Sequence, residues 1–319
     1  MKARGFNFTA IVAAAFAFCL FTAIPARAGI YYVTVSGLGG EPDYEQRFTA
    51  MANDLDKLLK SAGSDTHVYT LTGADATRAR MSQTLEQVAE KAKPEDDFVL
   101  ILIGHGSFDG VQYKFNLPGP DISASEIASL CDRIPSRRQL IVNTTSSSGG
   151  SIAALEKPGR AVIASTKTGT EKNATVFARY FVEALHDPIV DLDKNDSISA
   201  MEAFEYADRK TVTFYDSQKR LATEHAVFED TGKGDPVRAA TPDAAEGHFL
   251  STFTLLRIGA AQRAANDPAK RDLLAKKEEL EQKIDVLKYQ KAAMAPDDYK
   301  KQLTEALVEL ARVQGDLDK

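Results

Sequence analysis

The chain has 319 residues, with 45 acidic against 39 basic side chains, so its formal net charge is −6 at pH 7. Hydrophobic residues make up 44% and charged residues 26%, which excludes a disordered chain, a collagen-like repeat and a protein with many membrane-spanning segments. The acidic balance also argues against a general nucleic-acid binder, because such proteins present a basic surface to the phosphates.

Residues 1–28 have the pattern of a secretory signal peptide. A short basic start is followed by an apolar run over residues 8–24, and Ala26-Arg27-Ala28 fits a cleavage site of the A-x-A type. A single membrane anchor is the alternative, but the run is short and ends at a proline. We therefore expect an exported bacterial protein, periplasmic or secreted, with no transmembrane segment after cleavage.

Cleavage takes away three basic side chains, so the net charge of the mature chain becomes −9. It also leaves Cys131 as a lone cysteine, which cannot form an internal disulfide. An exported chain of this length must then be held together by its hydrophobic core alone.

Apolar, β-branched runs alternate with helical patterns through the next part of the chain. Strands are predicted at 30–35, 67–71, 98–103, 139–143 and 161–164. The run 98–103 is apolar without alternation, which is typical of a central strand covered on both faces. Helical spacing from Phe48 to Leu59 and a capping box at Ser123 place helices between strands. The pattern predicts an α/β fold with a mainly parallel central sheet, in which ligands bind beyond the carboxyl ends of the strands.

Two of these strands end in residues that carry chemistry. His105 and Gly106 follow the central strand, and Ser146 lies in a hydroxyl-rich stretch after the next one. An imidazole and a hydroxyl at neighbouring strand ends could hydrogen-bond each other, which is the minimal arrangement for acyl transfer. The Gly106 amide could help to bind an oxyanion. The alternatives are a loop histidine satisfied by the backbone and a turn whose hydroxyls cap the following helix.

An apolar strand ending in His-Gly, followed 41 positions after His105 by Ser146 in the pattern Ser-x-Ser-Gly, resembles the legumain-like cysteine peptidases. The resemblance covers most of residues 30–260. It implies a caspase-haemoglobinase-like α/β sandwich, which we place at residues 29–262. In that family the position matching Ser146 holds the cysteine nucleophile. In that family the region around Glu171 helps to form the substrate pocket. Glu171 could recognise a basic side chain, but it could equally cap a helix.

Serine at the nucleophile position changes the chemistry that the resemblance implies. A thiol is acidic enough to form a thiolate beside an imidazole, whereas a serine hydroxyl needs a general base that is normally oriented by a carboxylate. Asp109 is a conceivable orienting group, and Cys131 lies in the preceding helical pattern, where it cannot replace the nucleophile. We therefore expect a pseudopeptidase that serves as a binding or scaffold module for a peptide or protein. The alternative is an active hydrolase with a Ser146–His105 dyad.

Residues 191–202 match the twelve-residue calcium loop of the EF-hand. The expected oxygen ligands of Ca²⁺ are Asp191, Asp193, Asn195, the carbonyl of Ser197, Ser199 directly or through water, and Glu202. Position six holds Asp196 in place of glycine, which weakens the loop without excluding it, because aspartate tolerates positive φ better than most residues. An isolated loop predicts a structural role for calcium. The alternative is a solvated acidic turn that caps the helix beginning at Ser199.

Residues 266–319 have a different pattern. Two apolar stripes flank a break at Ala295-Pro296, and they predict an antiparallel helical hairpin of coiled-coil type. The stripes consist of Leu273, Leu280, Ile284 and Leu287, and of Tyr299, Leu303, Leu307, Leu310, Val313 and Leu317. The charged faces are most simply solvated, but the hairpin could pack on the main domain, self-associate or dock a partner.

Overall fold

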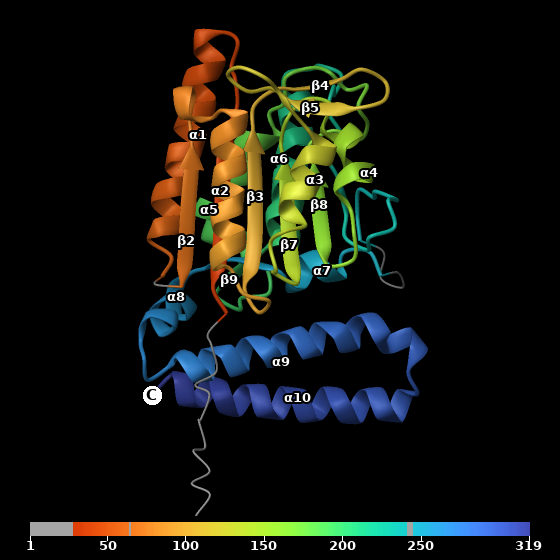
Figure 1. Cartoon of the computed structure of the whole chain (residues 1–319). Coiled ribbons are helices and arrows are strands. Elements are labelled where there is room, and N and C mark those ends of the chain that lie inside the picture. Colours follow the sequence, from red (N-terminus) through yellow and green to blue (C-terminus); the bar gives the residue numbers. More distant parts are fainter. Residues whose placement is uncertain (1–27, 64, 241–244) are drawn as a thin grey trace, which may run out of the picture.

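The computed structural model describes residues 28–63, 65–240 and 245–319. The predicted signal peptide, apart from Ala28, therefore lies outside the described residues. A six-stranded sheet forms the centre of the molecule, and a pair of long helices lies beyond one end of its strands (Figure 1). Within the three described ranges, no helix has the length and apolar character that crossing a membrane requires.

The central sheet has the order β10-β8-β7-β3-β1-β2. Its strands run parallel except β10, which is antiparallel to β8. The strands of the described chain are β1 (Ile30–Ser36), β2 (Thr66–Leu71), β3 (Asp97–Ile103), β4 (Gly106–Phe108), β5 (Tyr113–Phe115), β6 (Ile122–Ser123), β7 (Arg138–Asn143), β8 (Arg160–Ala164), β9 (Ser197–Ser199), β10 (Val227–Glu229) and β11 (Thr254–Arg257). Each predicted strand is present, so the α/β class with a mainly parallel sheet is confirmed. Small separate sheets are formed by β4-β5-β6 and by β9-β11.

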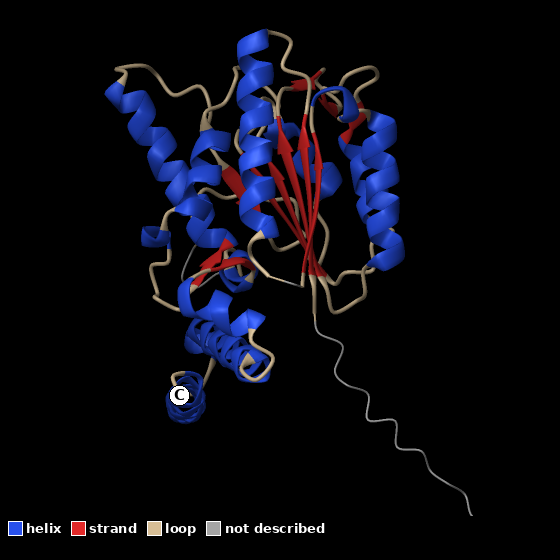
Figure 2. Ribbon diagram, turned by 90° about the vertical axis from the view of Figure 1, so that its left-hand side faces the viewer, coloured by secondary structure: helices blue, strands red, loops and turns tan. Residues whose placement is uncertain are grey.

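Helices cover both faces of the sheet, as Figure 2 shows with the strands seen between them. The helices are α1 (Pro42–Lys60), α2 (Arg78–Lys91), α3 (Ala124–Cys131), α4 (Ile152–Leu155), α5 (Phe177–His186), α6 (Ala200–Ser217), α7 (His248–Thr252), α8 (Gly259–Asn266), α9 (Arg271–Gln290) and α10 (Pro296–Leu317). Residues of α1, α5 and α6 pack against one face, and residues of α2, α3 and α4 pack against the other. Alternate side chains of β3 enter these two cores, which is why this strand is apolar along its whole length.

The C-terminal helices form the predicted antiparallel hairpin. Lys270, just before α9, donates a hydrogen bond to the carbonyl of Leu317 at the end of α10 (2.6 Å). Three members of the first predicted stripe are buried in α9, with Leu274 buried in place of Leu273. In α10, however, Leu307 of the predicted stripe is 47% exposed and Ala306 is buried instead. The other five members of the stripe are buried or half-buried, so the prediction fails at Leu307 alone. The predicted domain boundary at residue 262 falls inside α8.

Candidate functional site

His105 and Ser146 lie at the same edge of the central sheet. β3 and β7 are hydrogen-bonded neighbours in parallel register, with Leu102 opposite Asn143. The loops that follow these two strands must then meet, which confirms the predicted placement of the two residues on neighbouring strand ends. The small sheet β4-β5-β6 lies at this same end of the molecule (Figure 1).

The Ser146 hydroxyl interacts with the backbone of Gly106. Its Oγ accepts a hydrogen bond from the Gly106 N–H (3.2 Å) and donates one to the Gly106 carbonyl oxygen (3.1 Å). A Cβ at Gly106 would lie 2.5 Å from the Ser146 carbonyl oxygen, so the close approach of the two loops requires glycine. The amide predicted to bind an oxyanion is therefore already paired with the hydroxyl predicted to be the nucleophile.

The imidazole of His105 packs against aromatic side chains of α1. Its ring centroid lies 4.8 Å from that of Tyr44 and 5.1 Å from that of Phe48, both edge-on. Burial lowers the pKa of His105, although a hydrogen bond to the backbone of Gly39 acts in the opposite direction. A lowered pKa favours the neutral ring. Within the described ranges, no hydrogen bond joins this ring to the Ser146 hydroxyl, whose partner is Gly106.

Two further candidate catalytic groups, Asp109 and Cys131, do not contribute to the His105–Ser146 site. Asp109 is exposed, and its Oδ1 accepts hydrogen bonds from the N–H groups of Val111 (2.9 Å) and Gln112 (2.8 Å). Asp109 thus shapes the turn between β4 and β5, and it does not orient His105. Cys131 is buried in α3, where burial raises the pKa of its thiol to about 12. A thiol that stays protonated at neutral pH is inert, as expected from its place in the helical pattern.

The remaining hydroxyls at this edge form a local network. The Tyr113 hydroxyl contacts Thr145 Oγ1 (2.6 Å) and Asn143 Oδ1 (3.2 Å). Ser148 Oγ lies 3.1 Å from the hydroxyls of both Ser165 and Thr166. These side chains are buried and neutral, so the turn after β7 is held by short-range hydrogen bonds without any charge.

Sequence reasoning missed a second imidazole at the same edge. His225 precedes β10, whose antiparallel direction brings its start to the carboxyl end of β8. His225 Nδ1 lies 2.5 Å from Glu171 Oε1, and Glu171 Oε2 accepts hydrogen bonds from the N–H groups of His225 and Lys167. Glu171 therefore binds the histidine, and it does not cap a helix. The pair is separated by 54 positions, so no local motif marks it.

Glu224, next to His225, is a buried carboxylate that no sequence motif marks. It is 2% exposed and accepts hydrogen bonds from the N–H groups of Val176 (2.7 Å) and Phe177 (3.2 Å) and from the Tyr215 hydroxyl (3.0 Å). Burial raises its pKa to about 7 despite these three donors.

Comparison with known proteins gives structural neighbours but no match in sequence. No protein-family model and no curated protein matches the chain. A solved protein from Geobacter sulfurreducens is similar at 14% identity with a TM-score of 0.45, over 66% of this chain and 95% of its own. The Drosophila initiator caspase Dronc is 11% identical (TM-score 0.42; 65% of this chain, 81% of Dronc). Caspase-1 from Spodoptera frugiperda is 11% identical (TM-score 0.44; 64% and 86%). The legumain-like family and the role of Ser146 stay predictions.

The predicted calcium loop brings its acidic side chains together. Asp191, Asp193 and Glu202 each offer a carboxylate oxygen, and these atoms lie within 4.8 Å of one another. Asp196 has φ = 65°, the left-handed conformation for which position six normally holds glycine. Burial and then the charge of Glu202 raise the pKa of Asp193 to about 6. The loop thus has the backbone shape of the motif together with mutual repulsion among its carboxylates.

The capping role of the alternative is also present, although Asp191 is buried and the turn is therefore not fully solvated. Ser199 and Glu202 form a reciprocal capping box at the start of α6, and Glu202 Oε1 accepts the N–H of Leu192 (2.8 Å). The loop ends in β9, which pairs with β11 and not with a second loop of its kind, as expected for an isolated motif.

The hairpin helix α9 packs on this loop, a contact that the sequence did not reveal. Lys277 of α9 is buried and donates a hydrogen bond from Nζ to the carbonyl of Asn195 (2.7 Å). Lys277 also lies 3.5 Å from Glu281, whose pKa is raised to about 7 by burial. A cavity of about 440 Å³ between the loop and α9 is lined by residues that include Asp193, Glu202, Asp285, Lys288 and Tyr289.

Proposed function

We propose that the protein is an exported, peptidase-fold binding module that has lost catalytic power. The observation that carries this proposal is the reciprocal pairing of Ser146 with Gly106. A hydroxyl that donates to a carbonyl and accepts from the would-be oxyanion donor offers neither a free nucleophile nor a free oxyanion hole. We expect a peptide or protein ligand to bind at the strand ends, beside His105, which packs against aromatic rings.

The position of the polar groups around His105 supports the same proposal. A serine nucleophile requires a base that takes its proton and a carboxylate that orients the base. His105 is bound to the backbone of Gly39, and the conceivable orienting group, Asp109, is engaged in its own turn. By analogy with disabled triads, we expect hydrolysis slower by several orders of magnitude than in a cysteine enzyme.

Calcium binding by residues 191–202 is the second part of the proposal. The donor set is all oxygen, as a hard cation requires, and the left-handed conformation of Asp196 supports the fit. The residues that would hold the ion are Asp191, Asp193, Asn195, the Ser197 carbonyl, Ser199 and Glu202. Bound calcium would neutralise carboxylates that otherwise repel one another, which is a structural role.

A serine-reactive fluorophosphonate probe tests the loss of catalytic power. We expect no labelling of the wild-type protein. Labelling that disappears in Ser146→Ala but persists in Ser107→Ala would overturn the proposal and establish the alternative, an active hydrolase with a Ser146–His105 dyad. Ser107 is a matched control because it is an exposed hydroxyl at the same edge. Peptide cleavage gained by Ser146→Cys would show that the nucleophile alone was lost.

A further inference from the structure

Gly29 immediately precedes β1, and its backbone is held by hydrogen bonds on both sides. Ala28 is exposed, whereas Gly29 is half-buried just before β1. The Gly29 N–H donates a hydrogen bond to Asp96 Oδ1 (2.6 Å), and its carbonyl accepts the N–H of Asp97 (2.9 Å). A Cβ at this position would lie 3.2 Å from the Asp65 carbonyl oxygen, closer than side chains normally approach. The backbone nitrogen of Gly29 is therefore held in place beside the carboxylate of Asp96.

Asp96 is a buried carboxylate that lacks a cationic partner in the described part of the chain. It is 5% exposed, and its second oxygen accepts the N–H of Lys93 (2.8 Å). Both of its donors, Gly29 and Lys93, are neutral backbone amides. A buried carboxylate is costly unless a positive charge compensates it, so this environment fits one more cationic group.

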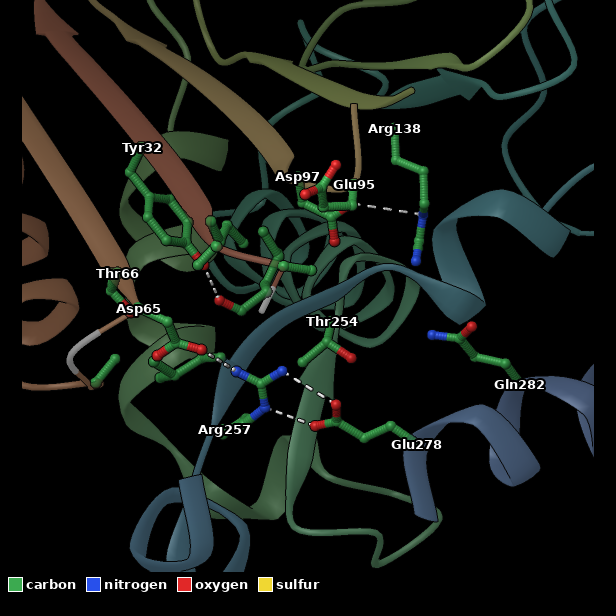
Figure 3. A pocket seen from close by; sticks show the side chains of 16 residues that line it. Tyr32, Asp65, Thr66, Glu95, Asp97, Arg138, Thr254, Arg257, Glu278 and Gln282 are labelled. Carbon is green, nitrogen blue, oxygen red and sulfur yellow. Dashed lines mark hydrogen bonds and ion pairs between the residues drawn. The ribbon is translucent and has the colours of Figure 1, made fainter. Parts of the chain in front are cut away.

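The nearby arginines are bound to other acids. Figure 3 shows the cavity of about 190 Å³ beside Gly29, in which Arg257 lies between Asp65 and Glu278. Arg138 faces Asp97 at 3.8 Å in the same cavity. A second cavity, of about 310 Å³, adjoins Gly29 and is lined by further charged or titratable residues, namely Asp65, His67, Lys91, Lys93, Asp96 and Arg271. None of these cationic side chains forms an ion pair with Asp96 within the described ranges.

We propose that the Ala28–Gly29 bond is hydrolysed on export and that the new α-ammonium group of Gly29 forms a buried ion pair with Asp96. A leader peptidase adds water across the amide bond. The carboxylate stays on Ala28, and the released nitrogen of Gly29 takes up a proton to become a cation. This nitrogen already lies 2.6 Å from Asp96 Oδ1, so the ion pair needs no rearrangement of the fold. The inference rests on the predicted leader and is independent of the role of Ser146.

The proposal is tested on chains that differ by one residue at the N-terminus. The mass of the exported protein must correspond to a chain that begins at Gly29; another first residue would overturn the proposal. Two recombinant chains, beginning at Gly29 and at Ala28, are then compared by thermal unfolding at pH 6, where an α-amine is protonated. We expect the Gly29 chain to melt about 2–4 °C higher, because one residue more moves the charge away from Asp96.

Two variants show whether Asp96 is the partner. The difference between the chains should vanish in Asp96→Asn and persist in Glu95→Gln, which removes an exposed carboxylate of the same loop. Equal melting temperatures in the wild-type background, or a difference that survives in Asp96→Asn, would contradict the ion pair. If Asp96→Asn does not fold, the acylation rate of the α-amine at pH 7 decides instead. We expect this rate to be at least about tenfold lower at Gly29 than at Ala28, and equal rates would refute the proposal.

Discussion

The two ends of the central sheet satisfy their polar groups in different ways. At the carboxyl end, the hydroxyl of Ser146 and its neighbours pair with nearby neutral groups of the same turn or of the adjacent strand end. At the other end, Arg257 joins Glu278 of α9 and Asp65, which are 21 and 192 positions away. The predicted calcium loop, which α9 contacts, belongs to this charged region.

Because of this difference, the two ends should respond differently to salt, metal ions and pH. Neutral hydrogen bonds between close neighbours are insensitive to salt, metal ions and moderate changes of pH. The stability of a buried charge depends on an opposite charge, which is supplied by a side chain of another element or by a bound ion. We therefore expect the hydroxyl network around Ser146 to be insensitive to these conditions, and the charged region to control the stability of the hairpin.

Breaking the Arg257 ion pair should have the largest effect. Arg257 contacts Glu278 through Nε (2.5 Å) and Nη2 (3.0 Å), and both side chains are mostly buried. Arg257→Ala leaves Glu278 and Asp65 without this cation, so we expect a loss of about 3 kcal/mol in the free energy of unfolding. Urea denaturation measures the loss, and hydrogen exchange should show faster opening of α9 and α10.

The control for this experiment is an exposed ion pair. Arg209 and Glu205 lie 3.4 Å apart with side chains 57% and 43% exposed. Arg209→Ala should change the free energy of unfolding by less than about 0.5 kcal/mol. Equal losses in the two variants would show that burial of the Arg257 pair does not matter.

Calcium should have the next largest effect, and it should act through residues 191–202 in the charged region. At a concentration of 100 times its dissociation constant, a ligand of the folded state adds about 2.7 kcal/mol of stability. We expect calcium to raise the melting temperature of the wild-type protein and chelation to reverse the rise. Glu202→Gln should abolish this response, whereas Glu205→Gln, on the same helix, should keep it. A response that persists in Glu202→Gln would remove residues 191–202 as the site.

The carboxyl end also holds two exceptions to the neutral pattern, the Glu171–His225 pair and Glu224, and Glu224 gives that end a dependence on pH. Its pKa is raised by burial to about 7 from a usual value of 4.5, so the folded state binds a proton more tightly than the unfolded state. Its contribution to stability is therefore largest below about pH 4.5 and declines as the pH rises to about 7. We expect wild-type protein to lose about 2.5 kcal/mol across this window relative to Glu224→Gln. If the curves of unfolding free energy against pH run parallel for the wild type and Glu224→Gln, the raised pKa of Glu224 is contradicted.

The sequence was sufficient for the elements whose signals are local. Strand periodicity placed the five predicted strands, and the parallel arrangement implied that His105 and Ser146 would share an edge. The sequence did not reveal which group each side chain binds. Whether a serine hydroxyl meets an imidazole or a backbone amide depends on how closely two loops approach, which here is set by Gly106.

The same limit applies to contacts between distant segments. The Lys277 side chain reaches Asn195 across 82 positions, and His225 reaches Glu171 across 54, so no spacing rule could pair them. In the hairpin, periodicity predicted the helices and most of their inward-facing residues correctly but misassigned single positions. Leu307 is exposed because the inward-facing row of α10 passes from Leu303 through Ala306 to Leu310.

Removing the Ser146 hydroxyl should have the smallest effect, and it tests whether the carboxyl end is held mainly by neutral hydrogen bonds. Ser146→Ala deletes two bonds to Gly106 that are longer than typical hydroxyl hydrogen bonds, so we expect a loss of about 1 kcal/mol in the free energy of unfolding. Because no ion pair is involved, this loss should be the same at low and high salt and with or without calcium. A loss that depends on salt would mean that Ser146 is coupled to charged groups, and the contrast between the two ends of the sheet would then fail.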